Sequence, residues 1–207
     1  MPGFERIAAE IWKQPGFRRN WLIGGLIASV PVLNLLLFGY LYQYVQRIGE
    51  GKGPALQAWR FNRALLEATL TGVAAALIYL LLPVFVGLFL SFMLGSFFVW
   101  IGLPLLGATA AWLPATLALL FAVPLFLLSL VHLNEHEDMK SLLDWKEVIG
   151  ELQSRGQSLW APLMVFFGFM AIGWPLLGFV LYFAITPLTA VVAVRSARGA
   201  SDSGLRS

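Results

Sequence analysis

Residues 21–46 read WLIGGLIASVPVLNLLLFGYLYQYVQ, a run of 26 residues without Asp, Glu, Lys or Arg. As one straight helix the run would be about 39 Å long, whereas the hydrocarbon core of a bilayer is about 30 Å thick. Pro31 and Asn34 interrupt it near the middle. The stretch is therefore either one kinked, tilted span or two short helices that fold back at Pro31 and Asn34. Basic residues at both of its ends favour the folded pair.

The same lack of charge recurs along the chain. Of its 207 residues, 59% are hydrophobic and only 12% are charged, whereas soluble domains are about 25% charged. Residues 20–46, 68–134 and 156–194 carry no charged side chain, and runs of that length predict membrane-spanning segments. We therefore expect an all-α integral membrane protein with a single membrane domain, residues 1–207. The chain has no cysteine, which excludes disulfides and thiolate metal sites, and no cofactor is expected.

The chain is expected to repeat one plan three times. A short amphipathic helix lies in the membrane interface and leads into an apolar stretch that is broken at its centre. The units are residues 4–46, 55–134 and 140–194, followed by a polar tail at 195–207. Together they predict about six membrane-embedded helical segments, with a range of about four to eight. The alternative, that the amphipathic helices pack on one another outside the membrane, stays open.

The second and third units have distinct expected breaks. In the second unit, Phe61 and Leu65 share an amphipathic face. Two long spans are expected to follow, at about 66–94 and 113–133. The piece between the two spans is expected to be re-entrant or interfacial. In the third unit, two helices turn at Trp174 and Pro175. The amphipathic stripe of the third unit comprises Leu142, Trp145, Val148, Ile149 and Leu152.

The basic residues predict the topology. All fourteen Lys and Arg fall within residues 6–19, 47–63, 140–155 and 195–206, and loops rich in Lys and Arg stay cytoplasmic. Both termini are therefore expected in the cytoplasm, with anionic lipids rather than nucleic acid as the partner of the net charge of +3. Tryptophan favours membrane–water boundaries. The expected interfacial anchors on the inner side are Trp12, Trp21, Trp59, Trp145 and Trp160, and those on the outer side are Trp100, Trp112 and Trp174.

Part of this pattern resembles a known family. WLIGGL at residues 21–26, VPVLN at 30–34 and GYL at 39–41, followed by a Gly-containing linker and Trp59, are similar to the hallmark of the prokaryotic multi-pass family called domain of unknown function 4013. The similarity is strongest over residues 18–92 and extends to 139–194 through WKEV at 145–148, although the acidic pattern usual near Trp59 is replaced by AWRFN. The resemblance implies a multi-pass fold in the prokaryotic cytoplasmic (inner) membrane and supplies no activity.

One motif has the form of a zinc site. His132, Glu135 and His136 match H-x-x-E-H, in which two histidines hold zinc and the glutamate activates water. The third protein ligand would have to be Glu147 or Glu151. Because the motif lies where a span leaves the membrane, where such side chains are simply solvated, the sequence favours a polar cap and predicts no metal site. Without a second histidine on another span, His132 is also not favoured as a haem ligand.

Other conspicuous residues have structural explanations. Glu67 follows Arg63 by four residues, which favours an ion pair over an intramembrane carboxylate coupled to ions. Asn34 is expected as a turn residue beside Pro31 rather than as a ligand. Gly24 and Gly25 lack the spacing of a helix-dimerisation face, and we expect them to let helices bend or approach closely.

These observations predict a protein that is not an enzyme, because no phosphate loop, Ser-His-Asp set or catalytic carboxylate pair can be assembled. We expect a structural or accessory subunit of a larger membrane complex, or a membrane-shaping scaffold. Its expected partners are the lipid bilayer and other membrane protein subunits. The alternative is a small-solute transporter or channel component, since broken helices and internal repeats can build sites at the bilayer midplane.

Overall fold

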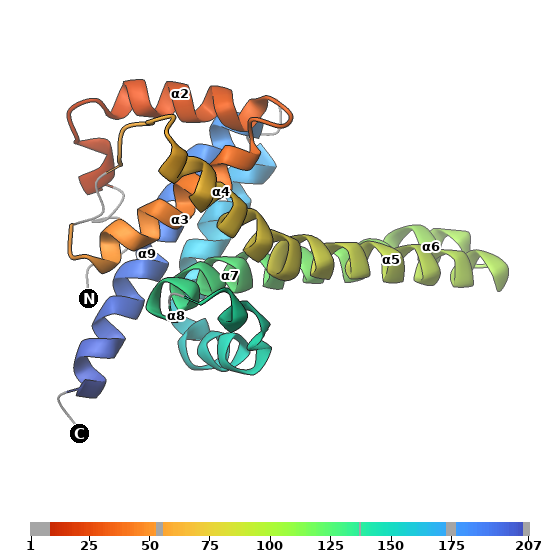
Figure 1. Ribbon diagram of the computed structural model, residues 1–207. Coiled ribbons are helices and arrows are strands. Elements are labelled where there is room, and N and C mark those ends of the chain that lie inside the picture. The colour runs from red at the N-terminus through yellow and green to blue at the C-terminus, as the bar shows by residue number, and fades with distance from the viewer. Residues whose placement is uncertain (1–8, 53–55, 137, 173–176, 205–207) are drawn as a thin grey trace.

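The computed structural model describes residues 9–52, 56–136, 138–172 and 177–204 (Figure 1). These described residues form helices and connecting turns, with no strand among them. The helices are α2 (Phe17–Ser29), α3 (Leu35–Gly49), α4 (Arg63–Ala76), α5 (Leu82–Trp100), α6 (Pro104–Ala110), α7 (Trp112–His136), α8 (Trp145–Ile172) and α9 (Leu177–Gly204), with a π-helical segment η1 (Leu77–Leu81) and a 3-10 segment η2 (Met139–Leu143).

The helices form a body and an arm. Figure 1 shows α2, α3, α4, α8, α9 and the end of α7 gathered together, while α5 projects from them with α6 and the start of α7 alongside. We define the arm as residues 82–121 and the body as the other described residues. In α7 the boundary is sharp, because Phe121 is exposed and every residue from Ala122 to Leu133 is buried.

The body is held by close contacts between helices. α2 packs on α9, and α3 packs on both α4 and α9. A Cβ placed on Gly24 would lie 2.3 Å from the ring of Tyr182, and one on Gly25 would lie 2.1 Å from the ring of Phe179. Only glycine permits these approaches, so the expectation that Gly24 and Gly25 bring helices close together is confirmed.

α4, η1 and α5 form one long helix that widens where it leaves the body. The Leu82 N–H bonds to the carbonyl of Leu77, five residues back, instead of four. Pro83 has no N–H to donate to the carbonyl of Tyr79, so the regular α-helical ladder is interrupted there. A short π segment of this kind is a common response to such an interruption. The arm therefore begins at a local defect that Pro83 causes.

Small residues let the two sides of the arm pack together. Gly87, Ser91 and Gly95 recur every fourth residue on α5. A Cβ on Gly87 would lie 2.3 Å from the Cβ of Ala118, and one on Gly95 would lie 3.2 Å from the Cβ of Ala111. Small residues at this spacing allow helix backbones to approach closely in lipid.

Two helices are long and apolar enough to cross a membrane by length and composition: Arg63–Trp100 and Pro104–His136. The apolar helices Leu159–Gly168 and Gly178–Val194 are shorter. The two long helices expected in the second unit are therefore present. Between them, α5 continues to Trp100 and α6 runs back beside it after a three-residue turn, so the piece expected between the spans is divided between the ends of these helices. Its re-entrant or interfacial placement in a membrane stays a prediction.

Other expected boundaries also change. The break at Pro31 and Asn34 is confirmed as a turn between α2 and α3. No separate amphipathic helix precedes α4, because Phe61 lies outside the helix and is 68% exposed. The amphipathic segment expected in the third unit is not a separate helix. It is the first part of α8, which runs on to Ile172 without a break. The predicted turn at Trp174 and Pro175 lies outside the described residues, and most of the expected polar tail continues α9 to Gly204.

Candidate functional site

The arm presents apolar side chains on all sides. No Asp, Glu, Lys or Arg occurs in residues 82–121. The most exposed large side chains are Phe85, Phe92, Trp100, Leu105 and Trp112, between 70% and 84% accessible. Soluble monomers rarely expose an apolar surface of this extent. The chemistry of the arm is that of a surface suited to lipid or to another apolar protein surface.

The length of the arm matches a bilayer. α5 has 19 residues, which corresponds to about 28 Å of helix, and the hydrocarbon core is about 30 Å thick. On the returning side, residues 104–121 cover a similar distance. The arm is therefore long enough to reach from one face of a membrane to the other while the body stays at one face.

The backbone of the arm is hydrogen-bonded even where its helices end. At the tip, Ile101, Gly102 and Leu103 donate their N–H groups to carbonyls of residues 97–99 at 2.8–3.1 Å. Gly102 has a φ of 79°, a conformation that glycine adopts without strain. In the first turn of α7, the Ala115 N–H donates to Ser91 Oγ on α5 at 3.0 Å. Lipid offers no partner for backbone groups, so these bonds fit burial in a membrane.

The five expected inner anchors fall into two groups. Trp59 stacks on Tyr40 with ring centroids 4.4 Å apart, Trp145 lies 4.6 Å from Tyr79, and Trp21 lies 5.6 Å from Phe179. These three side chains are half-buried and help to hold the body together. Trp12 and Trp160 are 45% and 41% exposed, so part of each side chain is accessible at the surface.

The two outer anchors that the structure describes both lie on the arm. Trp100 ends α5 at the tip, and Trp112 begins α7 after the short helix α6. Both are among the most exposed residues of the protein. The expectation that they lie at the outer membrane boundary stays a prediction, and Trp174 is outside the described residues.

The buried serine and threonine hydroxyls of α7 and α9 do not form a polar path. Ser129 donates to the carbonyl of Phe126, and Thr186 donates to the carbonyl of Tyr182. Thr189 likewise bonds within α9. These hydroxyls satisfy their hydrogen bonds inside their own helices and offer no chain of groups along which a solute or ion would be passed.

A polar groove lies on the body. It has a volume of about 460 Å³, and Arg47, Lys52 and Arg60 line it together with glutamine and asparagine side chains. Glu50 also lines the groove and pairs with Lys52. The excess of basic groups makes this groove suited to phosphate-bearing lipid headgroups.

A second, apolar groove lies at the base of the arm. Its volume is about 420 Å³, and α7 and α8 line it through residues that include Phe121, Pro124 and Trp160. Trp160 and Phe121 face each other edge to face at 6.5 Å. The groove extends the lipid-compatible surface of the arm onto the body.

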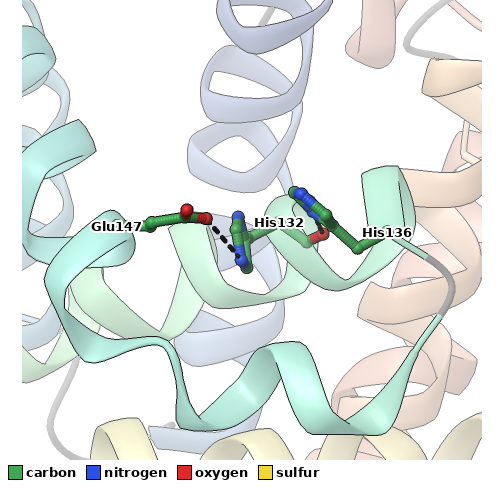
Figure 2. Close-up of side chains that lie close together, drawn as sticks. All are labelled: His132, His136 and Glu147. Atoms are coloured by element: carbon green, nitrogen blue, oxygen red, sulfur yellow. Dashed lines mark hydrogen bonds and ion pairs between the residues drawn. The ribbon is translucent and has the colours of Figure 1, made fainter.

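A carboxylate from another helix lies beside the two histidines of the motif. Figure 2 shows His132 and His136 on α7 and the carboxylate of Glu147, on the first turns of α8, directed toward His132. His132 Nε2 lies 3.5 Å from Glu147 Oε2, and the two imidazole rings have centroids 4.2 Å apart. Glu135 is exposed and is not part of this group. The structure thus selects Glu147 from the two possible third ligands and leaves Glu135 aside.

Two other expected roles can be compared with the geometry. Arg63 Nε donates to Glu67 Oε1 at 2.8 Å, so the predicted ion pair is confirmed. Asn34 lies exposed in the turn and precedes α3, but its side chain makes no capping hydrogen bond. Its expected place in the turn is therefore confirmed.

The small-residue face of the arm was not anticipated from the sequence. The expectation of close helix approach named Gly24 and Gly25 and did not include Gly87, Ser91 and Gly95, which have a spacing of four. That spacing, together with Gly107 and Ala111 on the returning side, was a readable signal for close helix packing.

Most of the chain matches one sequence family. The family described as "Protein of unknown function (DUF4013)" matches the chain over residues 22–188. The chain belongs to this family. A search of curated proteins and a search of solved structures each returned no match. In this DUF4013 protein the matched residues include everything from α3 to α8, so both the arm and the histidine group lie within the family region.

Proposed function

We propose that this DUF4013 protein is a non-enzymatic membrane scaffold or accessory subunit of the prokaryotic cytoplasmic membrane. The arm crosses the bilayer as a helical hairpin, and the body stays at the cytoplasmic face with both termini. The observation that carries the proposal is the charge-free surface of the arm, whose helix α5 has 19 residues, the length that a bilayer requires. Of the six expected segments, α5 and α6–α7 are proposed as the crossing helices, while α2, α3, α8 and α9 build the body.

The proposed docking surface lies on α2 and the turn that follows it. Leu22, Leu26, Val30 and Leu33 leave an apolar strip exposed on the outside of the body, each between 42% and 57% accessible. A strip of this kind beside a membrane anchor suits contact with another membrane protein subunit. The basic groove around Arg47 and Arg60 supports anionic lipid as a second partner.

A transporter or channel component is less well supported. The buried serine and threonine hydroxyls of α7 and α9 bond within their own helices, and Glu67 pairs with Arg63 on the exposed start of α4. Neither arrangement provides a polar site at the midplane of the kind that broken transporter helices build. We therefore expect no solute flux through the reconstituted protein.

The experiment separates anchoring from docking. Phe92→Lys places a charge on the arm, where bilayer insertion becomes unfavourable by about 2.5–3.5 kcal/mol, and Phe61→Lys makes the same change at a similarly exposed position on the body. We expect resistance to carbonate extraction to fall for Phe92→Lys alone. Leu26→Lys should leave extraction unchanged and release the partner with which the wild-type protein co-purifies in mild detergent.

Two results would count against the proposal. If Phe92→Lys and Phe61→Lys are extracted alike, the arm is not the anchor. If the wild-type protein is always recovered alone and does not alter the shape of liposomes, the scaffold or accessory role is wrong.

A further inference from the structure

We propose that His132, His136 and Glu147 bind one divalent transition-metal ion of the zinc class, which joins the end of α7 to the start of α8. One potential ligand atom from each of the three side chains lies within 4.8 Å of those of the other two. Two imidazoles and one carboxylate are a known zinc ligand set that leaves a fourth position for water. This inference concerns the body and does not depend on the scaffold role.

His132 points to a ligand because its polar atom has no hydrogen-bond partner. The side chain of His132 is buried, with 3% of the residue exposed, and Nε2 accepts or donates no hydrogen bond in the structure. Leaving a polar group buried without a partner costs about 1–3 kcal/mol. The 3.5 Å approach of Glu147 Oε2 is too long or poorly directed to relieve that cost, whereas a metal ion between the two atoms would do so.

His136 is oriented as a metal ligand commonly is. Its Nδ1 lies 3.0 Å from the carbonyl oxygen of His132, one helical turn earlier. With the proton on Nδ1, the ring donates to that carbonyl and carries its lone pair on Nε2. Metal-ligating histidines usually donate their other N–H to a carbonyl or carboxylate in this way, which fixes the tautomer and the ring orientation.

The two imidazole rings lie beside each other, with centroids 4.2 Å apart, and the Glu147 carboxylate lies beside His132. A divalent cation binds both rings in their neutral form and pairs with the carboxylate at the same time.

Only a small adjustment is needed to close the site. Zinc–nitrogen and zinc–oxygen distances of about 2.0–2.2 Å place tetrahedral ligand atoms roughly 3.3 Å apart, so the group has to contract by about 1–1.5 Å from the present arrangement. Glu147 can take part in this movement, because its side chain is 64% exposed and free to change rotamer. Histidine and carboxylate ligands suit zinc, cobalt and nickel better than magnesium or calcium.

The arrangement lacks the catalytic glutamate of the H-x-x-E-H enzymes. In H-x-x-E-H the glutamate between the histidines would be the base, yet Glu135 lies outside the group. Glu147 takes the place of a ligand from a different helix. The ion would therefore tie together two segments that are separated by η2 in the sequence.

The test uses the full-length protein purified in detergent and stripped of metal with a chelator. Zinc and cobalt are titrated into the wild-type protein and into His136→Ala, Glu147→Gln and Glu135→Gln. We expect one ion per chain for the wild type, a visible cobalt spectrum of tetrahedral type, and a rise in the midpoint of thermal unfolding on metal addition. His136→Ala and Glu147→Gln should lose stoichiometric binding and the rise, whereas Glu135→Gln should keep both.

His136 and Glu147 are exposed, so their replacement should leave the fold intact, and circular dichroism checks this. The proposal is overturned if the wild-type protein binds no metal, if Glu135→Gln loses binding as fully as Glu147→Gln, or if binding survives in both His136→Ala and Glu147→Gln. None of these outcomes bears on whether the arm anchors the protein in a membrane.

Discussion

Tyr79 connects the root of the arm to the body. Its ring is fully buried against Trp145, and its hydroxyl donates to the carbonyl of Leu142 at 2.8 Å. The contact spans 63 residues of sequence, so it joins η1 to η2 across the fold. Because Tyr79 lies within the π segment that precedes the arm, this bond fixes the direction in which the arm leaves the body.

The hydrogen bond of Tyr79 can be removed without changing the shape of the side chain. Tyr79→Phe leaves the Leu142 carbonyl unsatisfied in a buried position, which should lower the free energy of unfolding by about 1–3 kcal/mol. Urea unfolding in detergent, followed by tryptophan fluorescence, measures the loss. An unchanged midpoint would show that the bond does not form or that water replaces it.

Val32 carries backbone strain in the turn between α2 and α3. Its φ is 72°, a left-handed conformation that costs an L-residue about 1–2 kcal/mol. Val32→Gly should therefore stabilise the protein by about 0.5–1 kcal/mol after the added chain entropy of glycine is subtracted. Val30, with a φ of −95° and extended backbone, provides the control, and Val30→Gly should destabilise. Thermal unfolding compares the two, and a loss for both would contradict the strain.

For single residues, the sequence predicted contacts between near neighbours in the chain and did not predict contacts between distant ones. The Arg63–Glu67 pair follows from a spacing of four, and Pro31 predicts a break because it cannot continue a helix. The contact of His132 with Glu147 could not be read off, since it depends on how α7 and α8 pack. The sequence offered Glu147 and Glu151 equally, and only the path of the chain through η2 chooses between them.

The arm is the element on which the proposed function rests. Its two sides are held by the small residues of α5 against α6 and α7, because the side chains at its surface have nothing to pack on within the chain.

Gly87→Leu would force the side chain into the space of Ala118 and should cost about 1–3 kcal/mol of packing, splaying the hairpin. Ala108→Leu, at an exposed position of α6, adds the same bulk facing outward and should be neutral.

The separation of the two arm helices is measured with spin labels on cysteines at Leu88 and Leu117, both exposed on the arm. We expect a narrow distance distribution in the parent protein and in Ala108→Leu, and a longer, broader one in Gly87→Leu. An unchanged distribution in Gly87→Leu would mean that the two sides of the arm do not pack as the structure has them.

Elements were predictable where an apolar run was long. Both long helices of the second unit follow from the charge-free residues 68–134. The amphipathic segments were harder, since an apolar stripe looks the same whether it faces lipid or protein. In the third unit Leu142 and Val148 are buried in the body, so much of that stripe serves protein packing. The position of Gly102 at the tip also depended on how far α5 extends, which periodicity does not determine.

The whole molecule combines a body with a charge-free arm, and the proposed membrane crossing rests on this asymmetry. If the arm crosses the bilayer, its tip and the basic residues of the body lie on opposite sides of the membrane. The protein contains no cysteine, so single-cysteine variants can be labelled without background. Leu103 marks the tip, while Lys52 and Lys146 mark the body.

The most direct test is labelling of Leu103→Cys, Lys52→Cys and Lys146→Cys in oriented membranes with a maleimide that does not cross the bilayer. We predict that Leu103→Cys is labelled only from the outer side, and that Lys52→Cys and Lys146→Cys are labelled only from the cytoplasmic side. Labelling of Leu103→Cys from the cytoplasmic side alone would show that the arm does not cross the membrane. Labelling of Lys52→Cys and Lys146→Cys from different sides would show that the body itself is divided by the bilayer.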